Sequence, residues 1–218
     1  MSTQNSVNNQ RIEYIIDPGA SGDSFVQYNI NTIGKFKIGS DDSDSDKFKI
    51  SNGSALGTND FLILDADGLL LKPLQSAFSV YLGSSVANVT GDGTEYVVSF
   101  TELFDLNADF STNTFTAPKT ARYALTFASR VRNLSASYTT GFIKINTSNR
   151  LYYINTINCG AVQSSFNQYL FKGGALIDMD AGDIATFILK VSGSSKIVQI
   201  DGAASGSFIT YATGILIC

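Results

Sequence analysis

The 218-residue chain has no histidine and no tryptophan, and it has only two cysteines and three prolines. Without histidine it cannot form a Ser-His-Asp triad or a Cys-His pair, because both need an imidazole as the base. Serine chemistry assisted by lysine does not need histidine, but no motif for it is present. We therefore expect that the protein is not an enzyme and uses no cofactor.

The two cysteines, Cys159 and Cys218, are too few for the disulfide framework of a small secreted domain. Neither has a second ligand at the spacing of a metal site. We expect both thiols to be free.

Charged residues are also scarce, at 16% of the chain, and the formal net charge is −4. Nucleic-acid binding needs clustered Lys and Arg, which are missing here. No apolar run reaches the length of about 18 residues that a membrane-spanning helix needs. The opening residues, MSTQNSVNNQ, lack the basic and apolar regions of a signal peptide. We expect no nucleic-acid partner, no membrane insertion and no export signal.

Apolar residues alternate with polar ones along many short segments, as in half-buried strands. In the segment Thr120–Arg132, Tyr123, Leu125 and Phe127 fall on one face, and polar side chains fall on the other. Pro118 removes a backbone donor and predicts an edge or a break just before this strand. No segment after residue 73 has a helical apolar period, so we expect this part to be all-β.

Residues 104–131, FDLNADFSTNTFTAPKTARYALTFASRV, resemble the core signature of the C1q/TNF-like jelly-roll family. That signature has a Phe-led strand, an Asn, a polar turn, T-x-x-F-x-A-P, a Tyr and an alternating aromatic strand. Residues 77–82 match its first strand, residues 173–183 its penultimate region and residues 211–216 its last strand. The resemblance implies an all-β, C1q/TNF-like jelly-roll sandwich over about the last two-thirds of the chain.

Before residue 73, a short repeat predicts a narrow β-meander. Lys35-Phe36-Lys37-Ile38 recurs as Lys47-Phe48-Lys49-Ile50, and Phe61-Leu62-Ile63-Leu64 follows. Phe and Ile would point to one side of the sheet and both Lys to the other. Because such a sheet cannot bury its apolar side alone, we expect three copies to pack around a threefold axis, with the lysines outward.

The repeat and the junction at residues 72–78 also resemble fibre proteins of phages and other large DNA viruses, in which a slender β shaft precedes a C1q-like head. The resemblance implies a flexible or attachment arm at 1–10, a β shaft at 11–72 and a jelly-roll head at 73–218. It further implies a homotrimer that is assembled in the host cytoplasm, is carried on the virion surface and docks on a tail or capsid through its N-terminus. The head would bind a host-surface receptor, for which a glycan is one option.

In the resembled family the first and last strands lie in the inner sheet, next to the trimer axis. Phe78, Val80 and Tyr211 are therefore candidates for the axial core of the trimer. The same apolar residues are also expected in the core of a monomer.

Other functions stay open at this stage. The chain would fit a virion decoration protein without a receptor, or a bacterial extracellular adhesin exported by a non-standard route. A polysaccharide depolymerase would need two carboxylates flanking one bond.

Two acidic segments are candidates for chemistry. Asp42, Asp44 and Asp46 alternate with serines and can in principle wrap Ca²⁺, although the Gly and the distal Glu of an EF-hand loop are missing. A solvated turn explains the same pattern, and we expect the turn and no metal. Asp178, Asp180 and Asp183 lie in the segment equivalent to the L-x-x-G-D turn of the resembled family. A turn is therefore expected there rather than a pair of catalytic carboxylates.

Three tyrosines, Tyr138, Tyr152 and Tyr153, are candidates for binding sugar, because aromatic faces stack on sugar rings; core or interface positions explain them as well. Glycosylation sequons at Asn88, Asn133 and Asn146 are expected by chance in a chain so rich in Asn, Ser and Thr.

Overall fold

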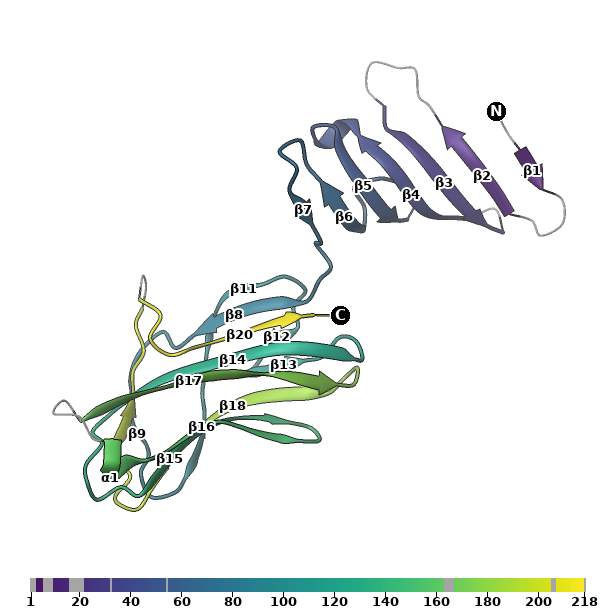
Figure 1. Ribbon diagram of the computed structural model, residues 1–218. Helices are drawn as coiled ribbons and strands as arrows, with labels where there is room; N and C mark the ends of the chain where they lie inside the picture. Colours follow the sequence, from purple (N-terminus) through teal and green to yellow (C-terminus); the bar gives the residue numbers. More distant parts are fainter. Residues whose placement is uncertain are drawn as a thin grey trace. The chain divides into compact units, whose positions relative to one another are not determined.

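The computed structural model describes residues 3–5, 10–15, 22–31, 33–53, 55–162, 167–204 and 207–217. The chain divides into two compact units, Met1–Leu74 and Gln75–Cys218 (Figure 1). Most of the expected arm at 1–10 and the thiol of Cys218 lie outside the described residues. The assignment of arm, shaft and head roles stays a prediction.

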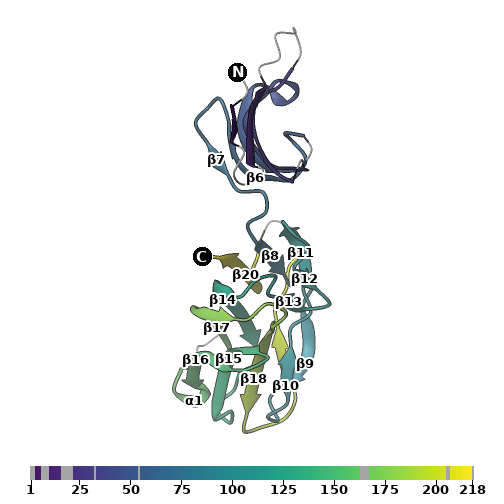
Figure 2. The ribbon, with the colours of Figure 1, turned by 90° about the vertical axis from the view of Figure 1, so that its right-hand side faces the viewer.

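The first unit is a single antiparallel sheet in which each strand pairs with the next one along the chain. Figure 2 shows that the sheet is strongly curved. Its strands, in spatial and sequence order, are β1 (Thr3–Asn5), β2 (Gln10–Ile15), β3 (Ser24–Ile30), β4 (Ile33–Asp41), β5 (Lys47–Asn52), β6 (Asp60–Leu64) and β7 (Leu70–Leu71).

The two copies of the Lys-Phe-Lys-Ile repeat lie on the neighbouring strands β4 and β5, where Ile38 pairs with Ile50. Side chains alternate along these strands, so Phe36 and Phe48 are exposed on one face. Lys37 and Lys49 lie on the other face and are only 4% and 3% exposed. The prediction that these two lysines point outward into solvent is therefore wrong.

The physical reason is that the lysines find partners on the face to which they point. The ammonium of Lys37 lies 4.4 Å from the centre of the Phe25 ring. Lys49 Nζ lies 2.8 Å from Asp41 Oδ2, 2.7 Å from Asp44 Oδ2 and 3.5 Å from Asp60 Oδ2. Buried charges are tolerated when they are paired and hydrogen-bonded in this way.

The second unit is a sandwich of two antiparallel sheets, with one short helix, α1 (Cys159–Val162), outside them. One sheet has the order β12 (Phe110–Ser111), β13 (Thr114–Thr116), β18 (Ile184–Ser192), β15 (Thr140–Thr147) and β16 (Leu151–Asn158), and β18 also pairs with β10 (Glu95–Val97). The other has the order β11 (Thr101–Asp105), β8 (Ala77–Tyr81), β20 (Tyr211–Leu216), β14 (Ala121–Arg132), β19 (Val198–Ile200) and β9 (Val86–Thr90), and β14 also pairs with β17 (Gln168–Met179).

In this unit the first strand, β8, pairs with the last, β20, and β20 pairs in turn with the central strand β14. Strands far apart in the sequence are thus neighbours in both sheets, as in a jelly roll. The prediction of an all-β jelly-roll sandwich is confirmed.

The core between the two sheets is strongly aromatic. Phe78 of β8 lies 5.0 Å, centre to centre, from both Phe110 and Phe115 of the opposite sheet. From β14, Tyr123 and Phe127 point into the same core, as the alternation predicted. The Tyr123 hydroxyl remains satisfied because it donates a hydrogen bond of 2.7 Å to the Lys119 carbonyl. Such aromatic pairs add to the stability gained from burial.

Truncating Phe78 to Ala should lower the free energy of unfolding by about 3–5 kcal/mol, because it leaves a cavity at the centre of this cluster. Leu151→Ala is the matched control: Leu151 is exposed on β16, and its change should stay within about 0.5 kcal/mol. Denaturant titration at fixed protein concentration measures both. An equal loss in the two variants would contradict the described core.

Lys49→Met should destabilise the first unit by about 3–5 kcal/mol, because it leaves the buried Asp41 carboxylate without its partner. Lys35 lies on β4 and is exposed, so Lys35→Met should change the stability of the unit little. Hydrogen exchange of β4 and β5 amides in the full chain reports this unit. Equal protection in the two variants would show that the ion pairs contribute nothing.

The same ion pairs predict a dependence on pH. Hydrogen bonds from Lys49, and then from Ser43, hold the pKa of Asp41 below its ordinary value of 3.8. Asp41 therefore stabilises the folded unit at pH values above 3.8, and this contribution is lost as the pH falls from 3.8 through the lowered pKa. Exchange protection of β4 and β5 should decrease in that acid range in the wild-type chain and depend less on pH in Asp41→Asn. A parallel decrease in both would contradict the assignment.

Candidate functional site

The three residues predicted to lie on a trimer axis do not share one face. Phe78 and Val80 are 1% and 0% exposed and point between the two sheets. Their side chains are thus occupied within one chain and offer no surface to another. Tyr211 points to the opposite, outer face of the seven-stranded sheet, where it remains accessible.

Strand alternation explains which residues accompany Tyr211. Along β8 the residues between Phe78 and Val80, and just beyond them, are Ser79 and Tyr81, and Tyr81 pairs with Tyr211 of β20. Two positions along β20, Thr213 faces the same way, because successive side chains of a strand point to opposite faces.

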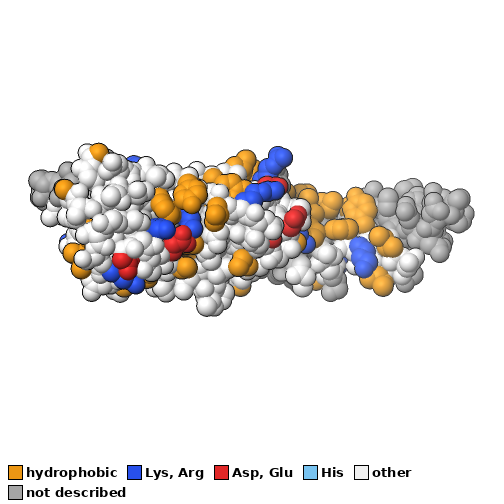
Figure 3. Space-filling view, turned by 90° about the horizontal axis from the view of Figure 1, so that it is seen from below, with side chains coloured by type: hydrophobic (Ala, Val, Ile, Leu, Met, Phe, Trp, Pro, Cys, Tyr) orange, Lys and Arg blue, Asp and Glu red, His pale blue; other side chains and the backbone are white. Residues whose placement is uncertain are grey.

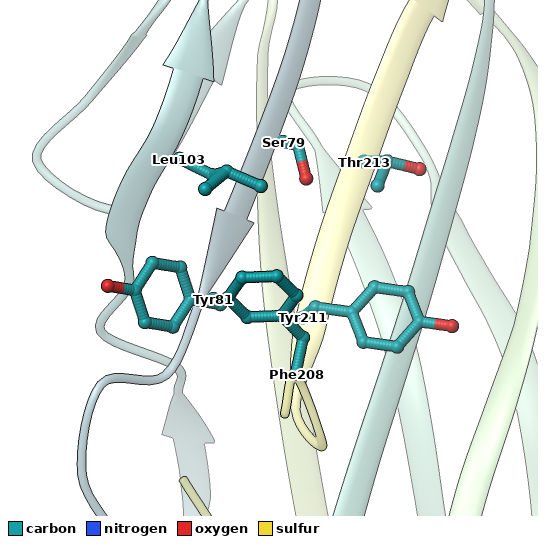
Figure 4. Close-up of a pocket in the computed structure, with 6 residues that line it drawn as sticks. All are labelled: Ser79, Tyr81, Leu103, Phe208, Tyr211 and Thr213. Carbon is teal, nitrogen blue, oxygen red and sulfur yellow. The ribbon is translucent and has the colours of Figure 1, made fainter. Parts of the chain in front are cut away.

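These outer residues line a pocket of about 350 Å³, together with side chains from β11 and from the loop before β20. In Figure 4 the Phe208 ring lies between the rings of Tyr81 and Tyr211. The rings of Tyr81 and Phe208 are 4.8 Å apart, centre to centre. The pocket is lined by Ser79, Tyr81, Leu103, Phe208, Tyr211 and Thr213.

The surface around the pocket is also apolar. Leu103 and Phe104 of β11, Phe208 of the loop before β20 and Ile215 of β20 are all exposed although they are large and hydrophobic. We refer to Tyr81, Leu103, Phe208, Tyr211 and Ile215 as the aromatic face. Single exposed apolar residues are normal in a soluble protein, whereas a contiguous patch marks an interaction surface.

The acidic turn between β4 and β5 does not form a metal centre among the described residues, where no group of three or more His, Cys, Asp or Glu is placed to hold an ion. Part of this turn is a single 3-10 turn, Asp42–Asp44. The Asp44 carboxylate binds Lys47 Nζ at 2.8 Å and Lys49 Nζ at 2.7 Å, and these hydrogen bonds lower its pKa. Lysine ammonium groups thus occupy the side of the carboxylate that a cation would take.

The second acidic segment forms a turn before β18. Asp183 accepts a hydrogen bond from the Asp180 backbone N–H at 3.0 Å, and its own N–H donates to the Asp180 carbonyl at 2.9 Å. The Asn149 amide also donates to Asp183. Asp178 instead lies 3.4 Å from the Arg150 guanidinium. The Asp183 carboxylate thus takes part in the turn that the resemblance implied, and the Asp178 carboxylate forms a surface ion pair.

The three tyrosines proposed for sugar binding have different environments. Tyr138 is buried, and its hydroxyl donates to the Ser195 carbonyl. Tyr152 packs against the core. Tyr153 is 59% exposed and lies edge to face against Phe142, with the ring centres 5.0 Å apart. Of the three, it alone presents a ring to solvent.

The remaining polar candidates are accounted for by local structure. Asn133 has a positive φ of 61°, and its side chain donates to the Ile197 carbonyl. Asn88 also has a positive φ, and Asn146 lies within β15. Cys159 is a buried free thiol, and burial raises its pKa. No helix in the described ranges is long and apolar enough to cross a membrane.

A part of the surface that the sequence did not reveal is the outer end of β14. Arg130 and Arg132 both reach Asp201, which follows β19 and is only 1% exposed. The partners are some 70 residues apart in the chain, so spacing carried no signal for their contact. Figure 3 shows that charged side chains form small, separate groups among uncharged ones on the face it displays.

Comparison with known proteins establishes no family for the chain. No protein family and no curated protein matches the chain. Similar solved structures include the globular domain of the zebrafish complement 1qA protein, at 19% identity over 66% of this chain and 98% of that one, with a TM-score of 0.46. Murine APRIL at pH 5.0 is similar at 9% identity over 66% of this chain and 99% of that one, also with a TM-score of 0.46. At these identities the likeness concerns the fold alone.

Proposed function

We propose that the chain is the subunit of a homotrimeric attachment fibre, a structural protein without catalytic activity that displays a jelly-roll head to a surface ligand. The observation that carries the proposal is that each unit has an apolar face that a single chain leaves uncovered.

In the second unit this is the aromatic face. Aromatic residues are enriched at protein interfaces, and fully burying a large apolar side chain contributes about 1.5–3 kcal/mol. The pocket between Tyr81 and Tyr211 offers the concave site that an inserted side chain of a neighbouring copy would fill. Three such contacts around an axis close without leaving a free surface of the same kind.

In the first unit the uncovered face is the Phe side of the repeat. Cross-strand pairing places Phe36 beside Tyr28, and Phe48 beside Leu64. Phe36 also lies 6.0 Å from Phe61, centre to centre. Between these contacts, Ile38 pairs with Ile50 and Ile50 with Leu62, so the exposed side chains belong to one apolar strip and are not isolated residues. A single sheet with one apolar face needs a covering partner to be stable in water.

The partner that suits both faces is another copy of this chain. Both faces are uncharged at their centres, as obligate interfaces between identical chains are. The viral setting, docking through the N-terminus and binding to a host receptor belong to the proposal through the resemblance of the repeat and of the junction at residues 72–78 to fibre proteins. On the head, the exposed Tyr153 with Phe142 is a surface on which a sugar ring would stack.

Charged substitutions on either face should weaken the trimer. Tyr211→Asp on the head and Phe48→Asp on the first unit should each raise the dissociation constant of the trimer by about 30-fold or more, as hot-spot residues do, and the double variant should be a monomer. Light scattering over a concentration series measures this. Tyr153→Asp, on the other sheet of the head, is the control and should remain trimeric. A double variant that assembles like the wild type would contradict both interfaces.

The attachment role predicts binding of the intact trimer to a surface ligand. On a glycan array, the wild-type chain should bind one group of saccharides, and Tyr153→Ala should lose neutral ones that depend on stacking. Absence of binding both to the array and to whole host cells would argue for a decoration protein instead.

A further inference from the structure

The outer end of β14 carries two arginines on one buried carboxylate. Positions 130 and 132 point to the same outer face, because Val131 between them is buried in the core. Arg130 Nε and Arg132 Nε each lie 2.6 Å from the same oxygen, Asp201 Oδ2. The two guanidinium groups are therefore held side by side, with their Nε atoms no farther apart than twice that distance.

The carboxylate is fixed from several sides. The Asp201 backbone N–H donates to the Arg130 carbonyl at 2.8 Å. Its second oxygen, Oδ1, accepts a hydrogen bond of 3.2 Å from the Gln199 amide. The pairing of β14 with β19 places Gln199 directly opposite Arg132. Asp201 thus orients both arginines by contacts that involve the backbone of two strands.

The charges in this cluster do not balance. Two guanidinium groups carry two positive charges, and Asp201 neutralises only one. Each guanidinium has five N–H donors, and only the one on Nε is used here. Within the described residues, Asp201 is the only acceptor for a hydrogen bond from either guanidinium. The side chains of Arg130 and Arg132 are 30% and 49% exposed, so both can be reached from solvent.

We propose that Arg130 and Arg132 form a binding site for an oxyanion, a carboxylate or a sulfate group carried by an acidic saccharide. Two adjacent guanidinium forks match the paired oxygens of such a group, and their hydrogen bonds to it are charge-assisted. The anion also neutralises the second positive charge, which Asp201 does not balance. The site itself stands on this geometry, while its occupation by a saccharide rests on the proposed attachment function.

The variant Arg132→Gln tests the site without disturbing the fold. It removes the excess charge and leaves Arg130 and Asp201 as a balanced pair, so the buried carboxylate keeps a partner. Arg122→Gln is the matched control, because Arg122 lies on the same strand and the same face but away from Asp201. A second variant, Arg130→Gln with Arg132→Gln and Asp201→Asn, removes all three charges together. It shows whether the arginines and their ion pairs with Asp201 are needed for binding.

The experiment is calorimetric titration of the full chain, at low ionic strength, with three probes: sodium sulfate, sialyllactose and a heparin-derived oligosaccharide. We expect the wild type to bind at least one saccharide, Arg132→Gln to bind it about tenfold or more weakly, and Arg122→Gln to bind it as the wild type does. Binding should also weaken as salt is added. Light scattering of each variant checks that the proposed trimer is retained.

The other outcomes are equally informative. Sulfate binding that Arg132→Gln abolishes, without saccharide binding, would support the oxyanion site, contradict an acidic saccharide as its ligand and leave the attachment function standing. Saccharide binding that is equal in all variants would overturn the site and leave the attachment function standing. No binding of any probe, with a loss of the trimer in Arg132→Gln, would assign the arginines to contacts between copies and overturn the site.

Discussion

The alternation of side chains along β14 is the constraint on which the second unit depends. This strand pairs with β17 along its whole length and with β20 along half of it, so neither edge is free. Each residue is thereby committed to the core or to the outer face. Tyr123 and Phe127 fill the aromatic core, while Arg130 and Arg132 are directed outward to Asp201. A shift by one residue would exchange these roles and place guanidinium groups between the sheets.

The two units solve the same problem with different means. The apolar face of a sheet must be buried against another element. In the second unit one face of each sheet is covered by the other sheet, and the aromatic face remains open. In the first unit, one face of the single curved sheet is polar, and Lys49 is buried there in ion pairs with aspartates. The other face, which bears Phe36 and Phe48, is uncovered. The proposed assembly with identical chains would cover both open faces at once.

Much of the fold of the second unit was predictable, because local sequence patterns determine its strands and breaks. The period of two in residues 120–132 and the break at Pro118 depend only on neighbours in the sequence, and the structure reproduces them. The turn at Asp180 and Asp183 was predicted from the family resemblance. Which side chains point toward a neighbouring chain was not predictable. The family resemblance selected Phe78 and Val80 as candidates for the trimer axis, yet the two-residue period that places them on one face of β8 also turns them inward and leaves Tyr81 outside.

Partners on neighbouring strands account for the remaining differences. Lys49 looked like a solvent-facing residue because its pattern alternates with Phe48, but Asp41 and Asp60 come from the two strands beside it. Asp201 reaches Arg130 only because β19 folds back along β14. Burial of a charge depends on such partners, and partners that are far apart in the chain leave no local signal.

The measurement that tests the central claim most directly is the mass of the wild-type chain by native mass spectrometry at micromolar concentration. The account predicts a particle of three chains with little free monomer, because the two uncovered apolar faces are buried between copies. A monomer at that concentration, with both faces exposed to water, would contradict it.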